Sequence, residues 1–476
     1  MRRRIFALQA LAFSVGLGCA LTPDYERPEL GLPDAFVQPS DPGESIANLS
    51  WFDTFRDPVL RDHIETALAE NQDLGVAAAR ISEARELVTF VRANQFPFLD
   101  LFGGAGRGRR SQILLPGAST SDNFSISGDL SFEVDLWRKL SRATEASRAD
   151  LLATEAAYRG VTIRLVSDVA STYLLLRDVD ARLAIAERTV SGRTDSLTII
   201  QARFEKGTVP ELDVNQAQVE LAIAEVATAS FERQVVQTEN ALRVLLGRYP
   251  GAIDRGRPLE EAPLDAAIPA GLPSELLQRR PDLVAAEQQL AAETARIGVA
   301  EAQRWPSISL TGSLGAISDE LSSLNSSEAK AWNLTAGLFA PVFHAGQLKA
   351  QAKAQHARAE QALRTYEGSL RQAFREVEDA LIAVRSLRTE HDARGRQVRA
   401  ARNAARLSRA RYDGGVVDFL EVLESERSLL EVLESERSLF TAELDESATR
   451  QGALTALVGL YQALGGGWTP PPPVSP

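Results

Sequence analysis

Reactive side chains are scarce in this chain. It has one cysteine, one methionine and four histidines among 476 residues. A single thiol cannot form an internal disulfide, and the histidines (His63, His344, His356 and His391) do not stand at metal-ligand spacing from one another. The sequence also lacks an HExxH motif, a Walker loop and a nucleophile elbow. We therefore predict a protein that is not an enzyme and that uses no metal and no cofactor.

Long apolar runs and an excess of positive charge are missing as well. No run of 18 or more apolar residues follows residue 18, so we predict no transmembrane helix, and any membrane crossing would have to use strands. The 52 lysines and arginines are outnumbered by 64 aspartates and glutamates, which argues against a nucleic-acid partner. Alanine, leucine, glutamate and arginine dominate the composition, and this usage favours long helices.

The N-terminus has the pattern of an export signal. Three arginines precede the apolar run Ile5–Gly18, which is shorter than the roughly 20 residues that a membrane helix needs. We predict that residues 1–18 are a cleaved signal peptide and that Cys19 is lipidated. Residues 16–19 resemble a bacterial lipoprotein signal, and Ala20 stands where an aspartate would favour retention at the inner membrane, so we expect the outer membrane. The alternative is an ordinary signal followed by an incidental cysteine.

The rest of the chain contains an internal repeat. Asp73 and Pro97 each recur 209 residues later, as Asp282 and Pro306, and the segment 203–209 resembles 411–417 at an offset of 208. Each half is expected to run helix, strand, loop, strand, long helix, tight turn, helix. We divide the chain into a lipidated N-terminal segment (19–57), repeat 1 (58–248), a linker (249–273), repeat 2 (274–467) and a proline-rich tail (468–476).

Four segments alternate between apolar and small polar residues and are predicted strands: Asn123–Leu136, Ser307–Leu314, Asn333–Phe339 and, least regularly, Phe96–Phe102. This alternation is typical of outer-membrane barrels. The alternative, a sandwich sheet with one wet face, lacks further strands to form its second sheet. The glycine- and arginine-rich stretch Gly103–Arg110 is expected to be an exposed loop. Four strands cannot close a barrel, so several chains would have to share one.

The predicted helices are exceptionally long. Trp137–Lys206 has no proline over 70 residues, which corresponds to roughly 105 Å of helix, and Leu348–Tyr412 is its counterpart. A heptad pattern predicts a left-handed coiled-coil seam in the first of these helices: Val169, Leu176, Leu183, Val190, Leu197 and Phe204, with Thr172, Val179, Ala186 and Ile200 three positions further on. The shorter segments Pro210–Gly247 and Ser274–Arg304 are expected to stack end to end beside a long helix.

A ten-residue duplication interrupts the symmetry of the halves. Residues 420–429 read LEVLESERSL, and residues 430–439 repeat them letter for letter. Ten residues rotate a helix by about 1,000°, which is about 80° short of three full turns. We predict that a bulge, a loop or a local lengthening near the turn absorbs the extra copy.

Five segments, in order, resemble the lipoprotein branch of the TolC-like outer-membrane efflux channels: residues 22–28, 51–60, 132–137, 279–283 and 464–468. The resemblance implies an α+β membrane protein. It also implies a homotrimer with a 12-stranded β-barrel, four strands per chain, continued by an α-helical coiled-coil barrel in the periplasm. Such proteins are passive exit ducts for small toxic compounds, and their partners are a periplasmic adaptor and an inner-membrane pump. The alternative is a lipid-anchored periplasmic coiled-coil scaffold without a pore.

The resemblance also implies functional positions at the two helix-hairpin turns. The adaptor-docking tips fall on Gly207, Thr208 and Val209 and on Gly415, Val416 and Val417, although glycines would suit plain hairpin turns equally well. Asp213 and Tyr412 match two residues that hold the periplasmic aperture shut. Val417 stands where some relatives have arginine, and Asp418 is a nearby acidic substitute. A solvated aspartate at a helix start is the alternative for Asp213. No motif in the sequence identifies the pump, the adaptor or the exported compound.

Overall fold

The computed structural model describes residues 24–38, 57–109, 119–264, 275–414 and 421–466 together with Ser111 and Ile113, and it describes no side chains for residues 413–428. Several predicted features lie outside this part of the chain. They are the signal peptide, Cys19, Gly415, Val416, Val417, Asp418 and the proline-rich tail.

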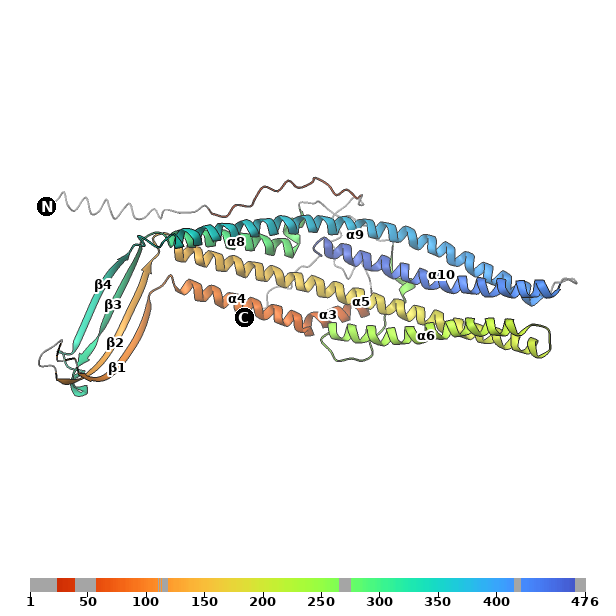
Figure 1. Ribbon diagram of the computed structural model, residues 1–476, viewed down its shortest axis with the longest axis horizontal. Coiled ribbons are helices and arrows are strands. Elements are labelled where there is room, and N and C mark those ends of the chain that lie inside the picture. The colour runs from red at the N-terminus through yellow and green to blue at the C-terminus, as the bar shows by residue number, and fades with distance from the viewer. Residues whose placement is uncertain are drawn as a thin grey trace. The chain divides into compact units, whose positions relative to one another are not determined.

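Both halves of the chain run through helices, two strands and a long helical hairpin (Figure 1). The first half comprises α3 (Pro58–Glu70), α4 (Gln72–Ala93), β1 (Phe98–Arg109), β2 (Thr120–Val134), α5 (Lys139–Glu205) and α6 (Glu211–Leu245). After the short helix η2 (Leu259–Glu261), the second half comprises α7 (Leu276–Arg279), α8 (Pro281–Ala302), β3 (Ser307–Ser318), η4 (Leu321–Ser323), β4 (Lys330–Phe339), α9 (Gln347–Gly414) and α10 (Glu421–Ala463).

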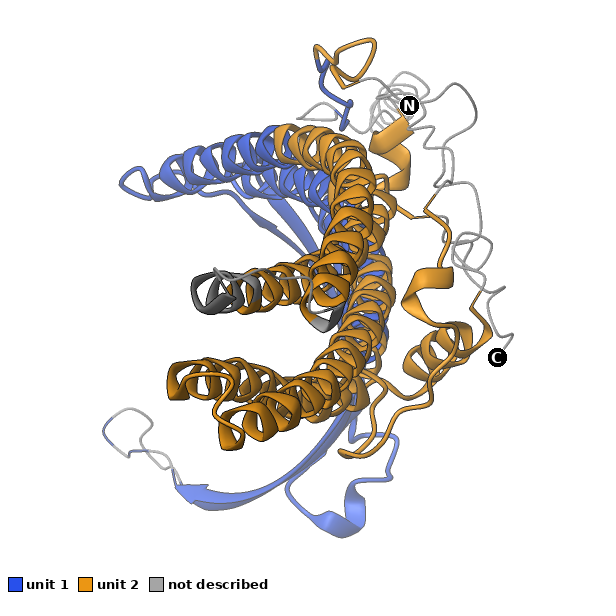
Figure 2. Cartoon of the chain, turned by 90° about the vertical axis from the view of Figure 1, so that its right-hand side faces the viewer, with its two compact units in different colours: residues 1–30, 79–156, 284–369 blue, residues 31–78, 157–283, 370–476 orange. Residues whose placement is uncertain are grey.

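The chain forms two compact units (Figure 2). Unit 1 comprises residues 1–30, 79–156 and 284–369 and contains the sheet with the adjoining helical segments. Unit 2 comprises residues 31–78, 157–283 and 370–476 and contains α3, α6, α7, α10 and most of α5 and α9. Each unit takes segments from both sequence halves, so the units cut across the sequence repeat.

The strands of unit 1 form one antiparallel sheet in the order β1-β2-β3-β4. The stretch Gly103–Arg109, expected to be a loop, is instead the second half of β1 and pairs residue by residue with Thr120–Ile126. Because glycine has no side chain, this stretch does not show the alternation of apolar and polar residues that indicates a strand. Within the ladder, Arg107 forms an ion pair with Asp122 on β2 at 3.5 Å. Strand β2 ends at Val134, two residues before the expected end, because the carboxylate of Asp135 accepts hydrogen bonds from the first turn of α5 (2.9 and 2.8 Å).

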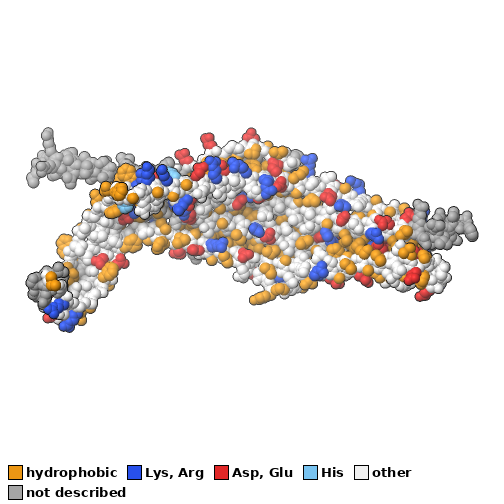
Figure 3. Space-filling model, viewed as in Figure 1, with side chains coloured by type: hydrophobic (Ala, Val, Ile, Leu, Met, Phe, Trp, Pro, Cys, Tyr) orange, Lys and Arg blue, Asp and Glu red, His pale blue; other side chains and the backbone are white. Residues whose placement is uncertain are grey.

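The two faces of the sheet differ in polarity. The pairing register places Leu99, Leu130, Gly312 and Leu334 in one row across all four strands. The same face carries further apolar side chains. Nine of its large residues are exposed to between 37 and 78%: Leu99, Leu101, Ile126, Leu130, Leu310, Leu314, Trp332, Leu334 and Leu338. The middle of the opposite face is mostly small and polar: Ser125, Ser127, Asp129, Ser309, Thr311, Ser313 and Thr335. Along the helices, in contrast, charges of both signs are interspersed with hydrophobic side chains (Figure 3).

The long helices are continuous, with 67 residues in α5 and 68 in α9. The predicted seam of α5 is most deeply buried at Val169 and Leu176, both fully buried, and it ends at Phe204, which is 42% exposed. Burial along the seam also includes Val179 and Ala186, which pack with Phe231 of α6 and Phe440 of α10. The heptad therefore marks the contact of α5 with both return helices in unit 2.

Each return helix ends in the same kind of joint. Gly247 after α6 has a φ of +71°, and Gly465 after α10 has a φ of +87°. A Cβ at Gly247 would lie 2.3 Å from the carbonyl oxygen of Glu70, and a Cβ at Gly465 would lie 2.8 Å from that of Arg279. The next side chain then caps the helix end, because Asn71 donates to the carbonyl of Leu245 at 2.9 Å and Arg280 donates to that of Ala463 at 3.1 Å.

This joint corrects the expected stacking of the shorter helices. The end of α6 meets Asn71 at the start of α4, and the end of α10 meets Arg280 at the start of α8. From their summed lengths we expected segment 210–247 to stack on segment 274–304. This expectation was wrong. Helix length alone does not identify partners, whereas the glycine at each helix end does, because the other backbone approaches it closely.

The duplicated segment lengthens one helix. Helix α10 is unbroken from Glu421 across the boundary of the two copies to Ala463, and its 43 residues exceed the 35 of α6. Gly465 stands 218 residues after Gly247, ten more than the offset at the turns. The second copy therefore keeps the spacing to the joint, and Val432 and Leu433 within it are buried. Of the three expected solutions, the structure has the local lengthening near the turn.

The joint generates a stability prediction. Gly247→Ala should lower the thermal unfolding midpoint, because the new Cβ collides with backbone and the positive φ costs a further roughly 1 kcal/mol or more. Gly192→Ala is the matched control, since Gly192 lies inside α5 and a Cβ added there would have nothing within 4 Å. The control should keep or raise the midpoint. Equal unfolding midpoints for the two variants would contradict the close backbone contact at Gly247.

Candidate functional site

The first hairpin turn, between α5 and α6, has the geometry of a glycine-terminated helix. Gly207 adopts a φ of +71° with open space around it, so the backbone conformation alone requires glycine. The N–H of Thr208 donates to the carbonyl of Arg203 at 3.0 Å, and its hydroxyl donates to the same oxygen at 2.8 Å. Gly207 and Thr208 are exposed, whereas Val209 is partly buried. Only the first two therefore present an accessible surface at this tip.

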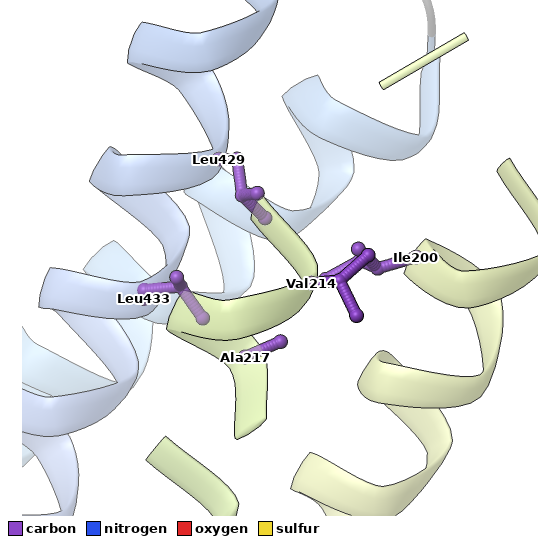
Figure 4. Close-up of a cluster of buried hydrophobic side chains, with 5 residues drawn as sticks. All are labelled: Ile200, Val214, Ala217, Leu429 and Leu433. Carbon is purple, nitrogen blue, oxygen red and sulfur yellow. The ribbon is translucent and has the colours of Figure 1, made fainter. Parts of the chain in front are cut away.

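An apolar cluster lies behind this turn. It comprises Ile200 of α5, Val214 and Ala217 of α6, and Leu429 and Leu433 of α10 (Figure 4). Leu197, Val209 and Tyr412 pack against it. The cluster joins the two hairpins of unit 2, so two residues expected at separate sites, Val209 at the tip and Tyr412 at the aperture, meet on one apolar core.

The predicted aperture residues Asp213 and Tyr412 both lie beside this cluster. Asp213 is in the first turn of α6 and is only 3% exposed, so it is not the solvated helix-start aspartate that we considered as the alternative. Its N–H donates to the carbonyl of Pro210 at 3.2 Å. Tyr412 lies on α9, and the guanidinium of Arg203 lies 4.4 Å from the centroid of its ring. This cation–π contact connects α9 to α5.

A layer of buried charge follows the apolar cluster. Arg193 of α5 and Glu220 of α6 are 4 and 2% exposed, and their charged groups lie 3.0 Å apart. Arg437 of α10 donates to the other oxygen of Glu220 at 3.0 Å. Arg193 also lies over the ring of Phe440, 5.4 Å from its centroid. Glu220 thereby links three helices and both hairpins.

The charge layer extends to the fourth helix of unit 2. Arg409 of α9 donates to Glu436 of α10 at 3.0 Å. Burial raises the pKa of Glu436 and lowers the pKa of Arg193, because removal from water disfavours the charged form of each group. The sequence pattern did not predict this layer. The available signal was Arg193 itself. It occupies the heptad position that Val179, Ala186 and Ile200 share, where an apolar residue is expected.

The N-terminal segment is fixed to each unit by carboxylates. In unit 1, Asp24 pairs with Arg142 at 2.7 Å, and Glu287 of α8 accepts two hydrogen bonds from Arg27 (2.7 and 2.8 Å) and one from Tyr25. Burial, together with this carboxylate, raises the pKa of Tyr25. In unit 2, the carboxylate of Glu378 accepts the backbone N–H groups of residues 37 and 38 (2.6 and 2.9 Å). The motif at 22–28 therefore has a structural role in its second half.

The described ranges offer neither a metal centre nor a membrane helix. They contain no group of three or more histidine, cysteine, aspartate or glutamate side chains placed to hold a metal ion. None of their helices combines the length and the apolar character needed to cross a bilayer.

Comparisons with known proteins place this geometry in a family. The profile of the outer membrane efflux protein family matches residues 63–248 and 272–466. The cation efflux system protein CusC of Escherichia coli (strain CFT073) is 34% identical over 466 residues, which cover 96% of this chain and 98% of CusC. The solvent efflux pump outer membrane protein SrpC of Pseudomonas putida is 35% identical over 462 residues, covering 95 and 96%.

Solved structures agree with the sequence comparisons. The outer-membrane channel OprN superimposes with a TM-score of 0.86 at 30% identity, covering 95% of this chain and 100% of OprN. The open-state MtrE channel of Neisseria gonorrhoeae gives a TM-score of 0.84 at 30% identity, with 94 and 98% covered. The match spans the helices, the four-stranded sheet and both hairpins. The chain belongs to the outer membrane efflux protein family.

Proposed function

We propose that this chain is the outer-membrane exit duct of a tripartite efflux system. It passively conducts small toxic compounds, which a periplasmic adaptor and an inner-membrane pump deliver. The observation that carries this function is the family match, which covers both halves of the chain. The channel structures match over nearly all of its length. Relatives of nearly equal identity are named for cation efflux and for solvent efflux, so the proposal is limited to small toxic compounds as a class.

The sheet supports a barrel shared by three copies. Its exposed apolar face is suited to lipid, and its edge strands β1 and β4 each pair with one neighbour within the described chain. Unpaired backbone groups at such edges are costly in hydrocarbon. If β1 of one copy pairs with β4 of the next, three copies close 12 strands, which falls within the known barrel sizes. Cys19, when lipidated, would add an acyl anchor in the outer membrane.

The hairpin turns support the docking and gating assignments. We place adaptor docking at Gly207 and Thr208, which are exposed, with Val209 holding the turn on the apolar cluster. The corresponding segment 415–417 would form the second tip. Asp213 and Tyr412, which lie beside the apolar cluster, are proposed, together with Asp418, to hold the periplasmic aperture shut in each of the three copies.

The barrel assignment predicts different effects of substitutions on neighbouring residues. Leu334→Arg places a cation in the middle of the apolar face and should cost about 2–4 kcal/mol of folding free energy in a bilayer. Thr335→Arg, on the opposite face, is the matched control. Heat-modifiable migration of the trimer and conductance in planar bilayers measure the outcome. A pore-free scaffold would show no conductance even in the wild type, and equal behaviour of both variants would exclude the lipid-facing assignment.

The aperture assignment predicts a change in ion preference. Asp213 is buried in this structure, so the assignment requires that opening of the aperture exposes it. Three exposed carboxylates around a narrow opening attract cations, and Asp213→Asn should then reduce the ratio of cation to anion permeability in single-channel recordings. Asp195→Asn, an exposed aspartate on α5, should leave this ratio unchanged. Unaltered conductance and ion preference in Asp213→Asn would remove Asp213 from the aperture.

A further inference from the structure

A groove in unit 1 is not used by the proposed function. It measures about 510 Å³ and follows the first turns of α5. The wall also includes Tyr25 of the N-terminal segment, Gln95 after α4 and Gln288 of α8. Tyr25 and Gln95 already make hydrogen bonds within the unit. The charged side chains of the groove therefore decide what it can bind.

Three charged residues line this groove: Arg138, Glu145 and Arg148. Glu145 is engaged by Arg142 at 2.7 Å, and Arg142 also pairs with Asp24 at 2.7 Å. Within the part of the chain that the structure describes, no carboxylate forms an ion pair with Arg138 or Arg148. The two guanidinium groups therefore give the groove a net positive lining.

Arg138 stands in a backbone conformation that suits glycine better. Its φ is +59°, which is uncommon for a residue with a side chain. At the equivalent position the second half has Gly346, at a φ of +86°, and there the preceding Ala345 also has a positive φ, of +47°. The carbonyl of Arg138 accepts the N–H of Arg142 at 2.8 Å, as that of Gly346 accepts the N–H of Ala350 at 2.9 Å. The turn itself therefore does not require arginine at position 138.

The groove begins next to the sheet. Arg138 follows Trp137, whose ring lies 5.2 Å from that of Trp305 and whose indole N–H donates to the carbonyl of Pro306 at 2.7 Å. Tryptophan is enriched at membrane–water interfaces. Tyr25, on the wall of the groove, is six residues after Cys19, so an acyl anchor would lie within about 20 Å of chain. If the sheet spans the outer membrane, as the proposed function states, the groove opens at the periplasmic leaflet.

We propose that this groove binds the phosphate headgroup of an anionic phospholipid from the periplasmic leaflet. Arg138 directly precedes α5, Arg148 lies on its third turn, and both line the groove, so each guanidinium group can meet a headgroup that enters it. Arginine suits this ligand because its planar fork donates two parallel hydrogen bonds to phosphate oxygens. Basic pockets between transmembrane helices bind lipid headgroups through the same pairing of cation and phosphate. This inference rests on the proposed function only for the position of the membrane.

The test measures lipid binding by the full-length purified protein. Native mass spectrometry of detergent-solubilised protein, titrated with phosphatidylglycerol or phosphatidylcholine, counts the bound lipids. Arg138→Asn, which tolerates a positive φ, and Arg148→Gln should each weaken phosphatidylglycerol binding about fivefold. Arg164→Gln is the matched control, because Arg164 is an exposed arginine of α5 outside the groove. Phosphatidylcholine binding should be weak and unaffected by every variant.

The outcomes distinguish failure of the lipid-binding proposal from failure of the proposed channel function. Equal phosphatidylglycerol binding by the wild type and the Arg138→Asn/Arg148→Gln double variant would overturn the proposal. Competition by free glycerol phosphate at the same concentration as the lipid would show a small-phosphate site and overturn the lipid assignment. Conductance in phosphatidylcholine bilayers is measured alongside. If the wild type fails to conduct while lipid binding follows the arginines, the proposed function fails and the groove remains.

Discussion

Backbone hydrogen bonding is the constraint on which the arrangement of this chain depends. A strand in lipid needs partners for all its N–H and C=O groups, because no water is available to replace them. The sheet has four strands, and its outer strands β1 and β4 pair on one side only within the chain. Its apolar face lies open, with side chains such as Leu334 and Trp332 more than 70% exposed. Both features are liabilities for a single copy and requirements for a shared barrel.

The two sequence halves form equivalent joints at the ends of α6 and α10, but with different capping side chains. Each return helix must end against another backbone, and both halves place a glycine with positive φ at that point. The polar group that caps the joint differs, since the first half uses the amide of Asn71 and the second uses the guanidinium of Arg280. Arg280 also pairs with Asp282 and Glu376, both at 2.7 Å. The first joint carries a single exposed ion pair instead, between Arg248 and Glu70 at 3.1 Å.

Much of the fold could be predicted from sequence because its signals are periodic. Alternation located all four strands, and the absence of proline located α5 and α9. The second half of β1 was missed because glycines between Gly103 and Gly108 carry no apolar signal, although their strand pairing is regular. The stacking of α6 was assigned wrongly because it depends on contact at Gly247, which summed helix lengths do not reveal.

The site was less predictable than the fold. The family resemblance suggested Gly207 and Thr208 at a tip and Asp213 and Tyr412 at the aperture, and these roles stay predictions. Their common packing on one apolar cluster depends on long-range contact between hairpins. Glu220 and Arg437 are 217 residues apart and follow no motif. Arg193 alone could have been noticed, as a charge on a seam of apolar residues, but its partner could not have been named.

The lengthened α10 has a consequence for symmetry. Helix α10 has eight more residues than α6, which corresponds to about 12 Å of additional helix. The additional residues lie at the turn end of α10. Helix α9 is only one residue longer than α5, so the extra length belongs to one arm of one hairpin. The two hairpins thus differ in the length of the return arm, so the two halves of one chain offer a binding partner unequal helical surfaces.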